Sequence, residues 1–187
     1  MSRSNPFIRK PRQPNWTVLA IGEGETEKAF LQFLKGLYNK REAGISIKVN
    51  YAGGGDPECV IDHAVKMNPK NYNRAFVLLD KDLPCRQTYL KKARTNKLEL
   101  IWCIPCIEGL FLKILETAFD ASVKTTADCK RLFEGKYLSE NEKLDPEKYA
   151  KIFSVELFES RRMQVQELDQ AIGFMTEKRI RIGKTKK

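Results

Sequence analysis

The sequence has little of what several common enzyme sites require. It contains one histidine, His63, so a Ser-His-Asp or Cys-His site would have a single base, and no residue near it in sequence supports such a site. We therefore expect His63 to be structural. The five cysteines include one C-x-x-C spacing, Cys103 and Cys106, without a second closely spaced pair, which disfavours a structural zinc site.

Long apolar runs and nucleotide-binding fingerprints are also missing. No run of 18 or more apolar residues occurs, so we expect no membrane span. No G-x-x-x-x-G-K-[ST] or G-x-G-x-x-G run follows a predicted strand, which excludes a Walker loop and a dinucleotide-binding fingerprint. Five cysteines without a visible signal peptide predict reduced thiols and a cytoplasmic location.

What is present is the composition of a globular domain with a basic surplus. The chain has 187 residues, of which 42% are hydrophobic and 31% charged, and its formal net charge is +10. That length suits one domain. We predict four parts along it: a flexible basic arm over 1–14, an α/β core over 15–120, a helical extension packed on the core over 121–175 and a basic tail over 176–187.

The most informative feature is a pair of carboxylates at the end of an apolar run. Residues 76–80 form a predicted buried strand that ends in Asp80, and Asp82 follows after one further residue. An Asp-x-Asp pair just past a strand can supply oxygen ligands to a hard cation such as Mg²⁺. Two aspartates can equally end a strand and open a turn with no metal.

Strand and helix patterns alternate through the first half of the chain, which favours a mainly parallel four-stranded sheet with flanking helices. The predicted strands are 16–21, 45–51, 76–80 and 98–101. Parallel strands place their carboxyl ends at one edge of the sheet, where open α/β sheets bind ligands. Because Glu23 directly follows the first strand, we expect it to face Asp80 and Asp82 at that edge.

The order of these parts resembles the Toprim domain of topoisomerases, primases and the overcoming-lysogenization-defect nucleases, in which a Glu after the first strand joins an Asp-x-Asp after a later one. A closer resemblance is to the RloB-like branch, small proteins associated with bacterial anti-phage systems. It covers residues 18–115 and rests on four motifs in order. They are Glu23-Gly-Glu-Thr-Glu27, Gly55-Asp56-Pro57, Asp80-Lys-Asp82 and the block Ile104-Pro105-Cys106-Ile107-Glu108-Gly109-Leu110, in which Pro105, Cys106 and Glu108 match while the Asn, Phe and Trp of the family do not.

The resemblance implies a Toprim-like α/β fold and a metal-dependent nuclease with one or two Mg²⁺ or Mn²⁺ ions. Asp80 and Asp82 would then be the main ligands, and Glu23 a further ligand or a general acid or base. Glu27 and Glu108 would complete the ligand set. From the residues alone, Glu27 could equally complement the dipole of a helix start, and Glu108 could be an outer carboxylate or the acid of another helix start.

The family setting also implies what the nuclease would act on and with. It implies phosphodiester cleavage of nucleic acid, either RNA such as tRNA or DNA, in anti-phage defence by abortive infection. It further implies a partner ATPase that gates the nuclease.

Basic residues are placed where they could contact a phosphate backbone. They dominate both predicted terminal segments, and several lie on a predicted helix after the Asp-x-Asp pair. This surplus favours sequence-independent binding of nucleic acid with a steep salt dependence, although ordinary solubility also places basic residues in tails. Glycines beside Glu23 would let backbone N–H groups approach a phosphate. The predicted phosphate contacts are Gly22, Gly24, Lys81, Lys91, Lys92 and Arg94.

Two other functions fit parts of the sequence. A non-catalytic nucleic-acid-binding module would keep the Toprim-like fold and the basic segments without turnover. The run Trp102-Cys-Ile-Pro-Cys106 also looks like a thioredoxin redox site, which makes a thiol-disulfide oxidoreductase using Cys103 and Cys106 a further alternative. Against it, the pair follows three strand-helix units, and the chain beyond it has a helical pattern.

After the fourth strand the pattern changes to helices. We predict an amphipathic helix continuing from Glu108, a short helix at 127–133, a helix start at Pro146 and one longer helix over 155–172. These helices either cap the sheet or form a wall beside the substrate.

Overall fold

Four parallel strands form the centre of the fold, as the sequence predicts. In the computed structural model they are β1 (Trp16–Gly22), β2 (Ile45–Tyr51), β3 (Arg74–Asp80) and β4 (Leu98–Cys103), in the spatial order β2-β1-β3-β4. All three neighbouring pairs are parallel. The structure describes residues 16–39, 44–68 and 72–176, so the predicted arm over 1–14 and all but the first residue of the predicted tail over 176–187 lie outside the described residues.

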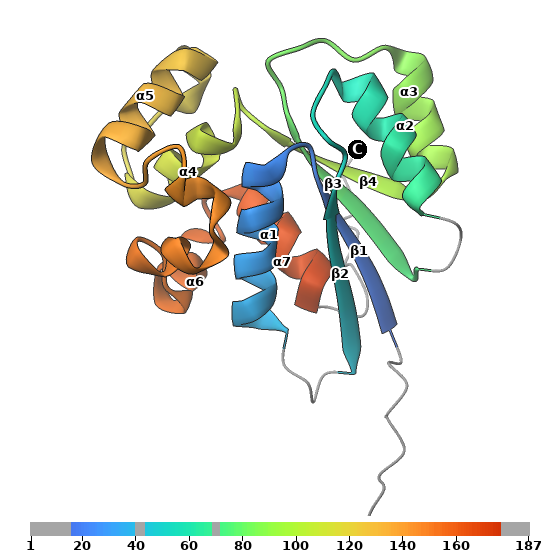
Figure 1. Cartoon of the computed structure of the whole chain (residues 1–187), viewed down its shortest axis with the longest axis horizontal. Coiled ribbons are helices and arrows are strands. Elements are labelled where there is room, and N and C mark those ends of the chain that lie inside the picture. Colours follow the sequence, from blue (N-terminus) through green and yellow to red (C-terminus); the bar gives the residue numbers. More distant parts are fainter. Residues whose placement is uncertain (1–15, 40–43, 69–71, 177–187) are drawn as a thin grey trace, which may run out of the picture.

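Three helices connect the strands and cover both faces of the sheet (Figure 1). They are α1 (Glu25–Tyr38), α2 (Pro57–Met67) and α3 (Gln87–Thr95). Helix α2 begins at a local sequence signal: the Asp56 carboxylate accepts a hydrogen bond of 2.8 Å from the Cys59 N–H, and Pro57 occupies the first helical turn. Helices α2 and α3 lie on one face of the sheet, and α1 lies on the other.

Alternating strand residues divide the core into two clusters, one on each face. On one face, Val18, Ala20, Phe76 and Leu78 pack with α1 and with helices from the C-terminal part. On the opposite face, a second cluster joins the sheet to α2 and α3, with Leu19, Ile21, Val77 and Leu79 from the strands. Because Asp80 shares its parity along β3 with Phe76 and Leu78, its side chain belongs on the α1 face.

The C-terminal part is helical, as the sequence predicts, and packs on the α1 face. Its elements are α4 (Ile107–Leu115), η2 (Ala121–Val123), α5 (Thr126–Lys136), η3 (Glu142–Leu144), η4 (Pro146–Lys151), α6 (Val155–Arg161) and α7 (Gln166–Thr176). Phe174 of α7 stacks on Phe76 with ring centroids 5.1 Å apart, so α7 caps the sheet directly. Tyr149 packs 5.7 Å from Phe30 of α1 and 5.5 Å from Phe111 of α4.

The single helix predicted over 155–172 is wrong, because the chain breaks between α6 and α7. The Arg161 side chain turns inward there, and its guanidinium donates to the Lys113 carbonyl at 2.6 Å and to the Ile114 carbonyl at 3.2 Å. The N–H groups of Gln164 and Val165 both donate to the Arg161 carbonyl, which closes a turn. The apolar periodicity runs through the break because both short helices face the same core.

None of the helices within residues 16–39, 44–68 and 72–176 has the length and apolarity that crossing a membrane requires.

Candidate functional site

The carboxyl edge of the sheet places Glu23 and Asp80 side by side. Gly22, the last residue of β1, lies opposite Leu78 of β3, and the Glu23 N–H donates to the Leu78 carbonyl at 3.1 Å. The Glu23 carboxylate then accepts a hydrogen bond of 3.0 Å from the backbone N–H of Asp80. Parallel pairing of β1 with β3 therefore produces the adjacency that the strand pattern predicts.

Glu27 joins this pair from the first turn of α1. Its residue surface is 6% exposed, and its carboxylate accepts a hydrogen bond of 2.7 Å from the Gly24 N–H. Burial raises the pKa of Glu27 to about 7, and the charges of Glu23 and Glu108 act in the same direction against the lowering effect of the Gly24 hydrogen bond. Glu27 therefore caps the helix and faces the other acids at the same time.

Asp80 lies at the centre of the acidic group. Burial raises its pKa to about 9, and the surrounding charges of Glu27, Glu23, Glu108 and Asp82 add to the effect in that order. Its Oδ1 atom is buried and has no hydrogen-bond partner among the described residues. A buried carboxylate oxygen without a donor is costly, and like charges around it increase the cost.

Glu108 completes the group from the first turn of α4 and is 1% exposed. One carboxylate oxygen receives the Lys143 ammonium at 2.6 Å, and the other is buried without a partner among the described residues. Lys143 also contacts Glu134 of α5 at 2.7 Å. We call Glu23, Glu27, Asp80 and Glu108 the carboxylate cluster.

Asp82 lies at the rim of the carboxylate cluster and is exposed. The preceding residue anchors the loop, because the Lys81 N–H donates to the Cys103 carbonyl at 2.9 Å and the Pro105 carbonyl at 3.0 Å. Burial raises the pKa of Glu23, the hydrogen bond from Asp80 opposes this, and the charge of Asp82 raises it further. The negative charge of Asp82 thus acts on the cluster although its side chain is exposed to solvent.

The two glycines predicted to contact phosphate have other structural roles. The Gly24 N–H donates to Glu27 and so is not available to a ligand. At Gly22 a Cβ atom would lie 2.7 Å from the Cβ of Glu27 and from the backbone nitrogen of Lys28. Gly22 therefore allows α1 to begin close against the end of β1, which brings Glu27 to Asp80.

Replacing Gly22 with alanine should lower the free energy of unfolding by roughly 1–3 kcal/mol, because the added methyl group meets backbone atoms that have little room to move. Gly36 in α1 is the matched control, since no atom lies within 4 Å of the added Cβ, and there Gly36→Ala should stabilise by up to about 1 kcal/mol. Urea unfolding of both variants measures this. Equal effects of the two substitutions would show that close packing at Gly22 does not matter.

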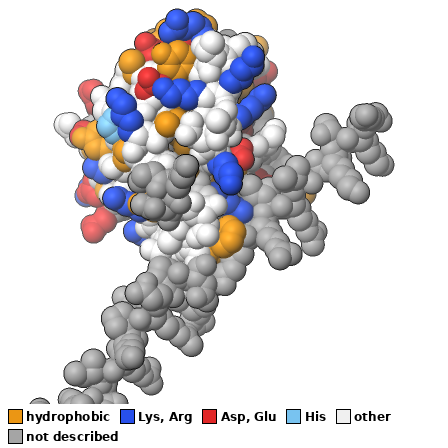
Figure 2. All heavy atoms as spheres, turned by 90° about the vertical axis from the view of Figure 1, so that its right-hand side faces the viewer, with side chains coloured by type: hydrophobic (Ala, Val, Ile, Leu, Met, Phe, Trp, Pro, Cys, Tyr) orange, Lys and Arg blue, Asp and Glu red, His pale blue; other side chains and the backbone are white. Residues whose placement is uncertain are grey.

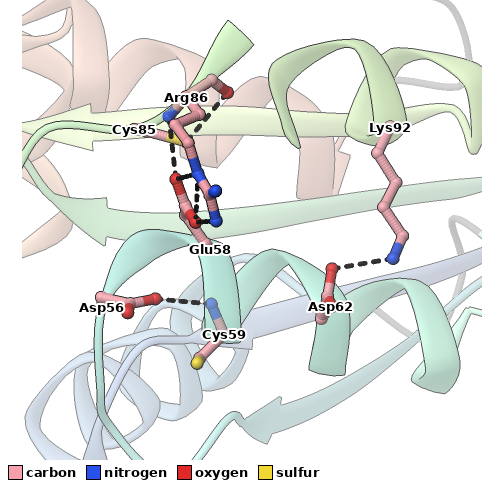
Figure 3. Close-up of polar contacts among 7 residues, drawn as sticks. All are labelled: Asp56, Glu58, Cys59, Asp62, Cys85, Arg86 and Lys92. Atoms are coloured by element: carbon pink, nitrogen blue, oxygen red, sulfur yellow. Dashed lines mark hydrogen bonds and ion pairs between the residues drawn. The ribbon is translucent and has the colours of Figure 1, made fainter. Parts of the chain in front are cut away.

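Two basic side chains at or near the predicted phosphate contacts form ion pairs with acids of α2. Figure 3 shows Lys92 of α3 reaching Asp62 of α2, with 2.8 Å between the charged groups, and Arg86 binding Glu58 through its guanidinium. These pairs fasten α3 to α2. Lys81, Lys91 and Arg94 are exposed and make no ion pair within residues 16–39, 44–68 and 72–176. Lys81 is one residue from Asp80, whereas α3 carries the other two away from the sheet edge.

Further basic side chains lie on the same side of the molecule. Figure 2 shows Lys and Arg side chains spread over the face that carries α2 and α3, with apolar and some acidic side chains between them. This distribution would let a phosphate backbone run along the face, since such contacts need charge rather than a shaped pocket.

The thiols of the predicted redox motif are inaccessible. Cys103 and Cys106 are both 0% exposed and unpaired. Burial raises the pKa of each thiol, and nearby acids raise it further, with Asp80 acting on Cys103 and Glu108 on Cys106. A redox thiol needs a lowered pKa and access to its partner, so the geometry argues against the oxidoreductase alternative. The Cys103 carbonyl instead accepts a hydrogen bond from the Lys81 N–H, and the first turn of α4 carries Glu108 of the carboxylate cluster. His63 is exposed on α2, away from the core.

The donor set of the carboxylate cluster fits a hard divalent cation in chemistry but is not assembled as a finished metal site. The donors are carboxylate oxygens, which Mg²⁺ and Mn²⁺ prefer. The partnerless Oδ1 atom of Asp80 is free to accept a cation, whereas Glu108, which also has one partnerless oxygen, already receives the Lys143 ammonium on the other. In the part of the chain that the structure describes, however, no three His, Cys, Asp or Glu side chains already converge as metal ligands do. Binding would therefore require rotation of the side chains.

Lys143 is the one member of the site that sequence reasoning missed. It precedes the predicted helix start at Pro146, and lysine is rarely buried, so no local pattern marks it. Its role depends on Glu108 and Glu134, which are 35 and 9 residues away in the chain. Only the folded arrangement of α4, α5 and η3 reveals it.

Comparison with curated proteins and with solved structures gives no match. A family model described as RloB-like protein matches residues 18–184, which is most of the chain. The match extends beyond the α/β core and through all the described C-terminal helices, including the residues that supply Lys143 and Glu134. The chain therefore belongs to the RloB-like family.

Proposed function

We propose that this protein is a Mg²⁺-dependent phosphodiesterase that cleaves nucleic acid at the carboxylate cluster. The observation that carries the proposal is the buried, partnerless Oδ1 atom of Asp80 among three further acids. Folding gathers these charges at a cost in free energy, and a divalent cation would remove that cost. Structural roles alone account for Glu27 as a helix cap but not for Asp80.

The residues of the cluster would have different roles around the metal ion. Asp80, Glu23 and Glu27 would hold the ion, with Asp82 at the solvent-facing rim near the scissile phosphate. When bound, Mg²⁺ would lower the pKa of a coordinated water and neutralise charge that builds on the phosphate. The Asp80 N–H anchors the Glu23 carboxylate, and the Gly24 N–H anchors that of Glu27, so both acids are kept near Asp80 and rotation of their side chains would complete the metal site.

The basic surplus supports nucleic acid as the substrate. A net charge of +10 would offset the repulsion between the acidic site and a polyanion. Lys81 lies beside the cluster, and Lys91 and Arg94 follow on α3. Since α3 rises about 1.5 Å per residue, the basic side chains could contact phosphates several nucleotides from the cleaved bond. RNA, including tRNA, and DNA both present this backbone.

Membership of the RloB-like family supports a role in anti-phage defence. In that setting, cleavage of cellular or phage nucleic acid would end a productive infection, and a partner ATPase would gate the nuclease. A gated enzyme can have low activity alone, so cleavage has to be measured with the protein in excess over the nucleic acid.

The test is cleavage of labelled tRNA, single-stranded RNA and double-stranded DNA with Mg²⁺, Mn²⁺ or EDTA. We expect cleavage that requires the metal and falls at least about 100-fold in Glu23→Gln, because that change removes a charge beside the reacting phosphate. Glu25→Gln is the matched control: Glu25 is an exposed acid two residues away and should leave the rate unchanged.

The rival is a binding module without turnover. It predicts retention of labelled nucleic acid in EDTA, with an affinity that falls steeply with salt, and no cleavage by the wild-type protein with any metal. Metal-independent cleavage, or equal rates for Glu23→Gln and the wild-type protein, would refute the proposed site.

A further inference from the structure

Lys143 is a buried lysine held between two acids. Its side chain is 5% exposed, and its ammonium lies 2.6 Å from Glu108 and 2.7 Å from Glu134. Burial lowers the pKa of Lys143, but hydrogen bonds with both carboxylates outweigh burial and raise it above its ordinary value. Lys143 therefore brings a permanent positive charge to the carboxylate cluster.

The backbone at Lys143 is fixed by residues from two other elements. The Tyr149 hydroxyl donates to the Lys143 carbonyl at 2.9 Å and lies 3.4 Å from the carbonyl of Thr26, the residue before Glu27. The Tyr149 ring is fully buried against Phe33 and Phe111. Because the aromatic core holds the backbone rigidly, the lysine is positioned before any ligand binds.

No second buried cation contacts the cluster in the described part of the chain. The charge of Lys130 lowers the pKa of Glu23, but Lys130 is exposed. The other buried basic residue, Arg161, binds the carbonyls of Lys113 and Ile114 at the far end of α4 from Glu108. Glu108 is electrostatically coupled to both Glu27 and Asp80. Whatever neutralises Glu108 therefore reduces part of the negative charge that raises the pKa values of Glu27 and Asp80.

We propose that Lys143 is a positioning residue that acts as a built-in cation beside Glu108, so that the C-terminal helices form part of the active centre. Lys143 takes the place that a second metal ion would otherwise fill. Glu108 is thereby a fixed, neutralised acid rather than a metal ligand, and Asp80, Glu23 and Glu27 are left for a single divalent ion. The statement about metal number rests on the proposed function, whereas the pairing of Lys143 with Glu108 does not.

The first experiment needs no metal. Thermal unfolding in EDTA should show a large loss of midpoint temperature in Lys143→Met, because Glu108 is left buried without its cation. Adding Glu108→Gln should restore most of that loss. A double variant that folds when Lys143→Met does not gives the same support, whereas a double variant that loses the sum of both single effects would overturn the pairing. Lys151→Met, which breaks the exposed pair with Glu142, is the control and should change little.

The second experiment measures Mn²⁺ binding by calorimetry. We expect one ion per wild-type chain, the same for Lys143→Arg, and either a second ion or binding at least about tenfold tighter in Lys143→Met, because an uncompensated carboxylate is added to the cluster. Binding unchanged in a folded Lys143→Met, or two ions bound by the wild-type protein, would overturn the assignment. A wild-type protein that binds no Mn²⁺ would reject the proposed function, and the metal-free experiment would still decide the role of Lys143.

Discussion

Asp80→Asn should abolish metal-dependent cleavage while making the metal-free protein more stable. Loss of the central ligand removes several kcal/mol of charge stabilisation, which corresponds to a fall in rate on the order of 10³-fold or more. The same change replaces a half-buried acid, which burial and the surrounding like charges force to keep its proton at a cost in free energy, with a neutral amide of similar shape. The amide carries no charge for Glu27 and Glu23 to repel. Activity and stability should therefore change in opposite directions, which a simple packing defect would not produce.

Two measurements on the same variant check this: the cleavage rate with Mg²⁺ and the midpoint of urea unfolding in EDTA. Asp62→Asn is the control, because Asp62 pairs with Lys92 on the outer side of α2, outside the carboxylate cluster, and should affect the rate little. If Asp80→Asn is less stable than the wild-type protein in EDTA, the Asp80 carboxyl group makes favourable interactions in the folded state without a cation, which contradicts the proposed metal site.

The second large effect concerns how pH and metal together control stability. Asp80 has its pKa raised from 3.8 to about 9 and Glu27 from 4.5 to about 7. A raised folded-state pKa means that the folded protein binds more protons than the unfolded chain between the two values. The contribution of these two groups to the free energy of unfolding is therefore highest below about pH 4. It falls as pH rises through 7 and toward 9, by at most about 1.4 kcal/mol per pH unit for each group.

Divalent metal should cancel that fall, because a cation replaces the protons held by the cluster. The measurement is urea unfolding at pH 5.5, 7 and 8.5 with EDTA or saturating Mg²⁺ (about 10 mM, well above a weak Kd). We expect the gain from Mg²⁺ to grow with pH and to shrink in Glu27→Gln. A gain that is independent of pH would indicate metal binding elsewhere on the protein.

The strands and the central pair of acids could be predicted from the sequence because they depend on general rules. Apolar runs predict the strands, and parallel pairing sends every carboxyl end to one edge, so Glu23 and Asp80 are expected at the same edge. They are in contact there because β1 and β3 are neighbours in the sheet. The N-terminus of α2 was equally predictable, since Asp56 and Pro57 act through local contacts. The sequence allows Glu27 to be either a metal ligand or an acid in a first helical turn, and the fold gives it a capping contact and a place in the cluster.

Other features depend on contacts that no local pattern encodes. The break between α6 and α7 arises because Arg161 binds carbonyls of α4, which lie 47 and 48 residues earlier. The N–H of Gly24 donates to Glu27, and the ammonium of Lys92 pairs with Asp62. Groups that could bind phosphate therefore make contacts within the fold instead. Lys143 is the clearest case, since its burial follows only from the meeting of α4, α5 and η3.

The most direct test of the proposed metal centre is a calorimetric titration with Mg²⁺ at pH 7, repeated in buffers with different heats of ionisation. The folded-state pKa values of Asp80, about 9, and Glu27, about 7, mean that the metal-free cluster holds protons at this pH. We predict that each chain binds one ion and releases on the order of one proton, and that Asp80→Asn binds none. Wild-type binding without proton release, or no binding at saturating Mg²⁺, would contradict a metal centre at Asp80.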